Sequence, residues 1–162
     1  MLYVAEFKGA SAMTLAYMVT SRGFANVVSS PIIGRLTDSV GRKKMIISGR
    51  ALMYTATGLL LVSNGEWLLI LAWVLMGVSD ATGVAWQAEE VELVHRNQRS
   101  RMTALSVGSF NLLAVPSSIL GGYLWDNVNP MAPFIVMTII DGLIRMPAIY
   151  YRIPEGNHSS KN

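Results

Sequence analysis

Long apolar stretches separated by short polar segments dominate the pattern of this sequence. Five stretches reach the length of about 20 residues that a helix needs to cross a bilayer. They are residues 9–34, 45–62, 67–88, 102–125 and 131–151. The fourth stretch is the clearest, because its 24 residues contain no Asp, Glu, Lys, Arg or His. The pattern therefore predicts an all-α integral membrane fold with five transmembrane spans.

The connections between these stretches are short. Asn64-Gly65 and residues 126–130 have the composition of tight turns. Helices that each cross the bilayer and are joined by short connections must alternate in direction. We therefore expect residues 1–162 to form one antiparallel helix bundle.

Composition supports a membrane protein over a soluble domain. Hydrophobic residues make up 52% of the chain and charged residues 14%, and the mean hydropathy is +0.41. Typical soluble domains carry about 25% charged residues. The chain contains no cysteine, which excludes a disulfide framework and a thiolate metal site. The expected surroundings are thus a lipid bilayer, and neither a cofactor, a metal nor a nucleic-acid partner is expected.

The basic residues predict the orientation. Cytoplasmic connections of membrane proteins carry an excess of Lys and Arg. One set of span ends carries nine of the 13 basic residues, whereas the opposite set carries only Lys8. The nine are Arg35, Arg42, Lys43, Lys44, Arg96, Arg99, Arg101, Arg152 and Lys161. We therefore expect a multi-pass protein of the cell membrane whose first polar connection and C-terminus are cytoplasmic.

The connection between the first two stretches combines two glycines, an acid and a cluster of cations. Its residues are Gly34, Asp38, Gly41, Arg42, Lys43 and Lys44. Gly34 is expected to allow a neighbouring helix to approach closely, and Gly41 to adopt a backbone conformation that other residues resist. Asp38 is expected to accept hydrogen bonds from free N–H groups at a helix N-terminus. The cations would lie at the anionic cytoplasmic leaflet.

This segment resembles the signature of the major facilitator superfamily, G-x-x-x-D-[RK]-x-G-R-[RK]-[RK], between two transmembrane helices. All six residues match, whereas Ser39 departs from the usual cation and leaves Arg35 or Arg42 as the expected partner of Asp38. The resemblance implies two six-helix bundles around a central cavity. Substrate would bind near the midplane, and the bundles would open to each side alternately.

The resemblance covers nearly the whole chain, although only this signature is specific. In the first half of such a carrier the fourth helix usually holds an early arginine, and residues 70–74 have none. We therefore prefer the second half of a carrier, helices eight to twelve. The residues before Gly9 resemble the tail of a missing helix, so an N-terminal half is the expected partner.

Four charged residues lie well inside the predicted spans, namely Arg22, Asp80, Asp141 and Arg145. A charge there costs at least about 2.5–3.5 kcal/mol, so each should face a partner or a wet cavity. Asp141 and Arg145 are four residues apart and are expected to pair. Arg22 could face Asp80, Asp141 or an anionic substrate. Arg50 lies near a span end, where its long side chain can reach the interface, so a structural role is expected.

These charged residues are the candidate substrate or coupling groups. If protons drive transport, an acid near the midplane must gain and lose a proton. We favour Asp80, because Asp141 has Arg145 one turn away while Asp80 has no cation within a turn of its own helix. Arg22 is its candidate partner across the bundle.

The function expected from these features is transport of a small solute by a secondary carrier. Substrate, coupling ion and direction stay open. The alternative is a non-transporting truncated fragment, or a half-carrier that needs a partner half. An intramembrane enzyme is disfavoured, because both histidines, His95 and His158, lie outside the predicted spans.

Overall fold

The computed structural model describes residues 2–63, 65–83, 95 and 98–152, and this part of the chain is helical with short connections. Every regular element in it is a helix, as the all-α prediction requires. The elements are α1 (Leu2–Phe7), α2 (Ala12–Val40), α3 (Arg42–Val62), α4 (Glu66–Ala81), α6 (Arg99–Asn127), α7 (Ala132–Ile140), the π-helical segment η2 (Asp141–Arg145) and α8 (Met146–Arg152).

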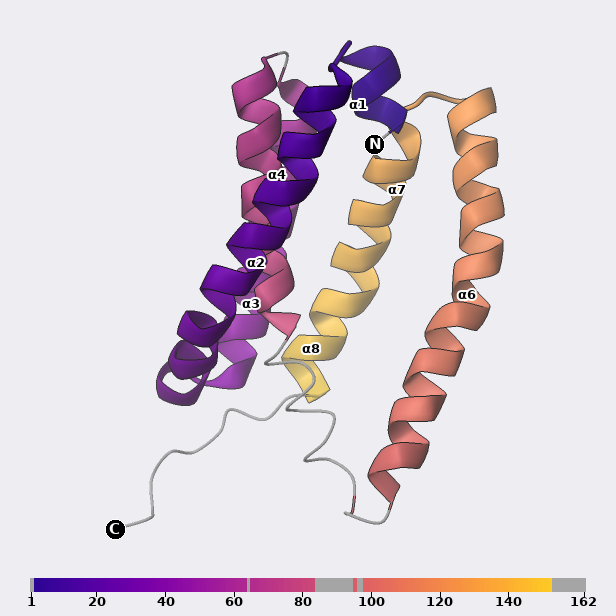
Figure 1. The fold of residues 1–162 in the computed structure, drawn as a ribbon. Coiled ribbons are helices and arrows are strands. Elements are labelled where there is room, and N and C mark those ends of the chain that lie inside the picture. Colours follow the sequence, from indigo (N-terminus) through magenta and orange to yellow (C-terminus); the bar gives the residue numbers. More distant parts are fainter. Residues whose placement is uncertain (1, 64, 84–94, 96–97, 153–162) are drawn as a thin grey trace.

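The long helices stand side by side in columns (Figure 1). Helices α2, α3 and α4 form one group, with α4 packed against both of the others. The column made of α7, η2 and α8 touches α3 at its α8 end, and α6 packs on α7. Successive long helices run in opposite directions, so the described part of the chain has the antiparallel arrangement that short connections predict.

Two described helices, α3 and α6, are long and apolar enough to cross a membrane. The described part of α4 has 16 residues, and residues 84–88 of the third predicted span lie outside the described residues. The last predicted span is divided among α7, η2 and α8. The number of spans, five, therefore stays a prediction. Residues 153–162, whose cytoplasmic location we predict, are also outside the described part.

The segment expected to be a loop at residues 35–44 is almost entirely helical, which corrects the predicted boundaries. Helix α2 continues to Val40, and α3 starts at Arg42. Gly41 alone separates them, and its φ of 99° lies in the region that favours glycine, as expected for this position. The predicted boundaries were too short because hydropathy identifies only the apolar part of a helix. Backbone hydrogen bonding continues the helix into its polar ends.

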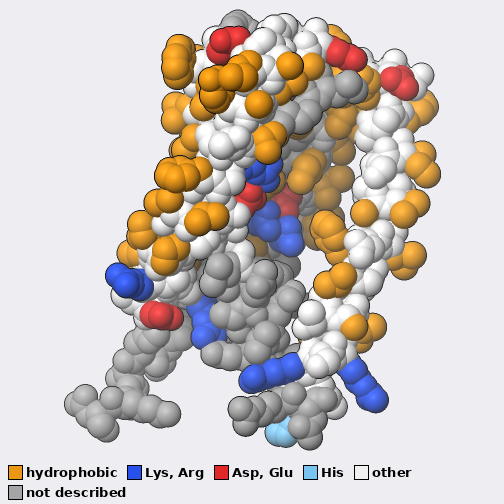
Figure 2. All heavy atoms as spheres, in the orientation of Figure 1, with side chains coloured by type: hydrophobic (Ala, Val, Ile, Leu, Met, Phe, Trp, Pro, Cys, Tyr) orange, Lys and Arg blue, Asp and Glu red, His pale blue; other side chains and the backbone are white. Residues whose placement is uncertain are grey.

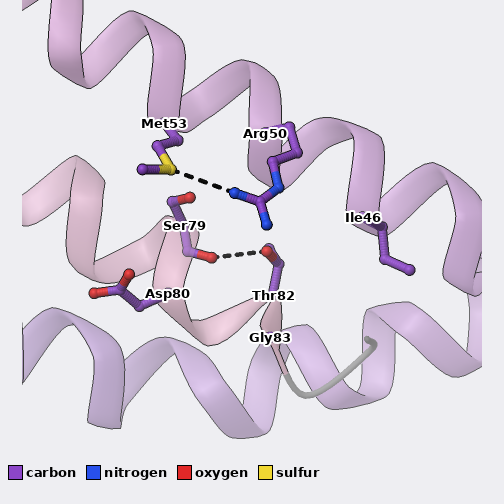
Figure 3. Close-up of a pocket in the computed structure, with 7 residues that line it drawn as sticks. All are labelled: Ile46, Arg50, Met53, Ser79, Asp80, Thr82 and Gly83. Carbon is purple, nitrogen blue, oxygen red and sulfur yellow. Dashed lines mark hydrogen bonds between the residues drawn. The ribbon is translucent and has the colours of Figure 1, made fainter. Parts of the chain in front are cut away.

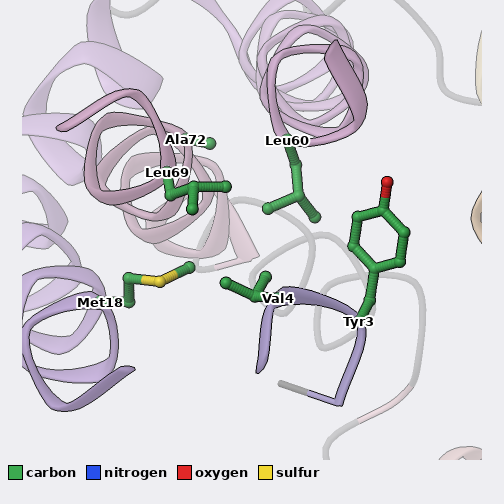
Figure 4. Packing of buried hydrophobic residues seen from close by; sticks show 6 residues of the cluster. All are labelled: Tyr3, Val4, Met18, Leu60, Leu69 and Ala72. Carbon is green, nitrogen blue, oxygen red and sulfur yellow. The ribbon is translucent and has the colours of Figure 1, made fainter. Parts of the chain in front are cut away.

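A hydrophobic core holds α1, α2, α3 and α4 together near the end of the bundle where α2 and α4 begin (Figure 4). Its buried residues are Tyr3, Val4, Met18, Leu60, Leu69 and Ala72. The Tyr3 ring also contacts Phe134 of α7, with 5.5 Å between ring centroids, and Trp125 of α6, at 6.3 Å. This end of the bundle is therefore fixed by packing, and the polar site described next lies farther along the helices.

Candidate functional site

Charged side chains gather at mid-height between the helix columns, where acidic and basic groups lie next to one another (Figure 2). The described residues form two ion-paired groups there. One joins α2 to α4, and the other joins α3 to η2. Hydrophobic side chains are scattered over the helices on both sides of these charged groups in this view, so the two groups form a polar centre flanked by apolar side chains (Figure 2).

The first group is the pair of Arg22 and Asp80. Nε of Arg22 donates to Oδ2 of Asp80 at 2.7 Å, and a second guanidinium nitrogen donates to Oδ1 at 3.2 Å. Such two-pronged pairs are stronger and more directional than single hydrogen bonds. The guanidinium also lies 5.4 Å from the centroid of the Trp73 ring. The side chains stay 39% and 38% exposed, so solvent or a ligand can reach both partners.

Close packing of α2 on α4 brings this pair together. Gly77 is buried three residues before Asp80, and a Cβ added to it would overlap the backbone carbonyl oxygen of Arg22. The same Cβ would lie 3.0 Å from Cβ of Ala25. Glycine therefore allows the two backbones to touch beside the ion pair, a use of small residues that is common between membrane helices. At Gly34, where we expected a close approach, an added Cβ meets no described atom within 4 Å, so the described residues show no such approach there.

The second group surrounds Asp141. Its Oδ1 lies 3.3 Å from Nη1 of Arg145, which confirms the pairing expected from their spacing. Its Oδ2 accepts a hydrogen bond from the Tyr54 hydroxyl at 2.8 Å and lies 3.7 Å from Nη1 of Arg50. Arg50 thus pairs with Asp141 within the bundle, although its place near a span end would allow it to reach the interface. One turn of α3 separates Arg50 from Tyr54, so both side chains reach the same carboxylate.

A cavity of about 180 Å³ lies between the two groups (Figure 3). Arg50 borders it from α3 and Asp80 borders it from α4, so one member of each group faces the same space. Ser79 and Thr82 also line it, and Oγ of Ser79 donates to the carbonyl oxygen of Gly49 at 2.8 Å. That bond fastens α3 to α4 beside the cavity. Among the described residues, the cavity is bordered by one cation, Arg50, and one acid, Asp80.

Both acids of the polar centre have a cation at hydrogen-bonding or ion-pair distance. The preference for Asp80 over Asp141 assumed that no cation lies near Asp80 along its own helix. Arg22 supplies one from α2, so this criterion no longer separates the two acids.

The signature residues lie at the junction of α2 and α3, away from the polar centre. Asp38 is exposed in the last turn of α2, and α3 begins without a side-chain cap. The capping role expected for Asp38 is therefore not seen among the described residues. Nor do the described residues show an ion pair between Asp38 and Arg35.

Three contributors to the polar centre escaped the sequence analysis, namely Tyr54, Trp73 and Gly77. Tyr54 lies four residues after Arg50, which places the two on one helix face. Gly77 lies three residues before Asp80, a spacing that suggests a close contact on the same face. Trp73 could not be found from spacing, because its partner Arg22 belongs to another helix.

Comparisons with known proteins agree with an all-helical membrane fold. The family model described as Major Facilitator Superfamily matches residues 1–162. A tetracycline resistance protein of class H from Pasteurella multocida is 26% identical over 151 residues, which cover 90% of this chain and 37% of that protein. The inner membrane transport protein YajR of Escherichia coli is 25% identical over 85% of this chain and 30% of its own length. The human synaptic vesicular amine transporter is 23% identical over 80% of this chain and 26% of its own length. The chain thus spans about a third of the length of these relatives.

Proposed function

The chain belongs to the major facilitator superfamily, and on that premise we propose that it forms part of a secondary carrier that moves a small solute across a membrane by alternating access. Family members act on solutes in a membrane, and relatives are named as transport proteins, including an amine transporter. We assign the chain to the second half of such a carrier, consistent with the absence of arginine from residues 70–74. The other half would complete the central cavity.

The observation that carries this proposal is the polar centre made by Arg22, Asp80, Arg50, Asp141 and Arg145. Charged groups among membrane helices are costly and face partners, solutes or ions on a transport route. The pairs join α2 to α4 and α3 to η2, so a sliding or tilting of these helices would remake them. Asp80 and Asp141 are the candidate proton-exchanging groups.

Coexpression with a candidate first half tests the proposal. Cells that make both halves should accumulate at least one labelled solute from a panel that includes tetracycline and primary amines, whereas cells with either half alone should not. Purified protein in sealed vesicles should show the same uptake, and a collapsed proton gradient should reduce it if protons are coupled. A correctly inserted pair that moves no solute of a broad panel would instead support the non-transporting alternative.

Cysteine labelling tests the proposed orientation. The chain has no native cysteine, so a single introduced thiol reports its own location. Asn127→Cys, at the end of α6, should react with an impermeant thiol reagent added to intact cells. Ser39→Cys, in the last turn of α2, should react only after the cells are permeabilised. The cysteine-free chain gives the background, and the reverse labelling pattern would contradict the cytoplasmic location of the signature segment.

Asp38 is proposed to stabilise one end state of the transport cycle. It is exposed beside the α2–α3 junction in this conformation, which leaves its carboxylate available for a contact that forms in another state. Asp38→Asn keeps the size and removes the charge. In a complete carrier we expect uptake to fall about tenfold, equivalent to about 1.4 kcal/mol, while the protein level changes little. Ser39→Ala, a change at the neighbouring exposed position, is the control, and loss of the Asp38→Asn protein itself would indicate a purely structural role.

A further inference from the structure

A second cavity lies between α2 and α4, near the end of the bundle where both helices begin, and has a volume of about 550 Å³. Pockets of 300–1,000 Å³ are typical of sites for small organic ligands. Residues from both helices line it, from Met13 to Phe24 on α2 and from Glu66 to Ile70 on α4. Arg22 and Asp80 are not among the lining residues, so this cavity is separate from the polar centre.

One negative charge and several aromatic rings determine the chemistry of this cavity. Among the described lining residues, Glu66 is the one with a formal charge. Tyr17, Phe24 and Trp67 contribute aromatic rings, and these residues are 54%, 70% and 84% exposed, so a ligand can reach them. Aromatic faces attract organic cations, most strongly where water is excluded. Met13 adds a flexible apolar surface that adapts to ligand shape.

The Glu66 carboxylate is held in place by hydroxyl groups of α2 and its cap. Its Oε1 accepts a hydrogen bond from Oγ1 of Thr14 at 2.8 Å. Oγ1 of Thr14 lies in turn 2.9 Å from Oγ of Ser11, the residue that caps α2. Neutral hydroxyls orient the carboxylate, and no ion pair to Glu66 is present among the described residues. Lys8, a basic residue at this end of the bundle, donates to the carbonyl oxygen of Leu61 at 3.1 Å.

We propose that this cavity binds an organic cation with an apolar body, with its charged centre beside Glu66 and its apolar groups against Tyr17, Phe24 and Trp67. An anion would be repelled by the carboxylate. Hydroxyl groups also line the cavity and can hydrogen-bond to polar parts of the bound cation; they belong to Ser11, Thr14, Tyr17, Thr20 and Ser21. This site is additional to the polar centre, and its existence does not depend on which solute crosses there.

Equilibrium binding to membrane vesicles that contain the full chain tests the proposal. Radiolabelled tetraphenylphosphonium is the probe, and vesicles without the chain give its partition into lipid. We expect saturable binding above that background. Benzyltrimethylammonium should compete, whereas neopentylbenzene, which has the same shape without the charge, should not. Equal competition by the two compounds, or binding no greater than in chain-free vesicles, would overturn the proposal without the use of any variant.

Variants locate the binding to Glu66. Glu66→Gln keeps an acceptor for Thr14 and removes the charge, so affinity should fall about five- to tenfold. Glu66→Asp should stay within about twofold of the unmodified chain, because the charge is kept. Trp67→Ala should weaken binding by about two- to fivefold. Asp126→Asn removes an exposed acid near the end of α6, outside this cavity, and should change nothing. Unchanged binding by Glu66→Gln would place the probe elsewhere and refute the assignment.

Discussion

Replacing Asp80 with asparagine is expected to reduce both the stability and the transport activity of a complete carrier. The change leaves the Arg22 guanidinium without the carboxylate that meets two of its nitrogens. A charge without a partner among membrane helices costs about 2.5–3.5 kcal/mol. Because both side chains are partly exposed, we expect the lower end of that range. The measurements are the thermal unfolding midpoint of the solubilised protein and the initial rate of solute uptake.

A paired substitution separates the two effects. Arg22→Gln combined with Asp80→Asn removes both charges, so stability should return toward that of the unmodified protein. Uptake should stay low, because the proposed polar centre has lost a charged partner on each of two helices. Asp126→Asn, an exposed acid outside the centre, is the matched control. If Asp80→Asn alone leaves both stability and uptake unchanged, the pair has neither a structural nor a transport role.

Gly77→Ala is expected to have a comparably large effect through packing. The added methyl group would overlap the carbonyl oxygen of Arg22 and press on Ala25. Overpacking of this kind usually costs about 1–3 kcal/mol. Because the overlap falls on backbone, the helices must separate, which also pulls Arg22 away from Asp80. We therefore expect the Gly77→Ala carrier to have a lower thermal unfolding midpoint and a lower initial rate of solute uptake.

Gly58→Ala on α3 is the matched control for that prediction. An added Cβ at Gly58 meets no described atom within 4 Å. Alanine also favours a helix over glycine by about 1 kcal/mol, so this variant should be as stable as the parent or slightly more. Equal behaviour of the two alanine variants would show that α2 and α4 do not touch at Gly77 in the membrane.

The helices themselves could be predicted from apolar length, because each stretch must satisfy its backbone hydrogen bonds internally in lipid. Their ends could not be predicted as well. The apolar stretch ends at Gly34. Helix α2 nevertheless continues through Asp38 to Val40, because polar residues at the membrane surface can stay helical. Gly41 was correctly expected to have an unusual backbone, because a reversal between two helices left little choice of residue.

The charged residues were found from sequence, and two of the three ion pairs were among the pairings considered there, namely Asp141 with Arg145 and Arg22 with Asp80. Spacing along one helix identified the pair of Asp141 and Arg145. Arg22 had three possible partners, since the relative rotation of two helices depends on contacts such as the one at Gly77. A structural role was expected for Arg50 from its place near a span end, whereas the position of η2 decides that it faces Asp141.

The π-helical segment η2 affects how the last helix should be compared with its relatives. A π-helical turn accommodates one more residue than an α-helical turn. The residues of α7 and those of α8 therefore follow different helical phases, although no break in the helix separates them. A helical wheel drawn through residues 131–151 as one α-helix would place the residues either before or after η2 on the wrong face of the helix. A relative with one residue fewer between Asp141 and Arg145 could have the same flanking surfaces, with the gap taken up inside this turn.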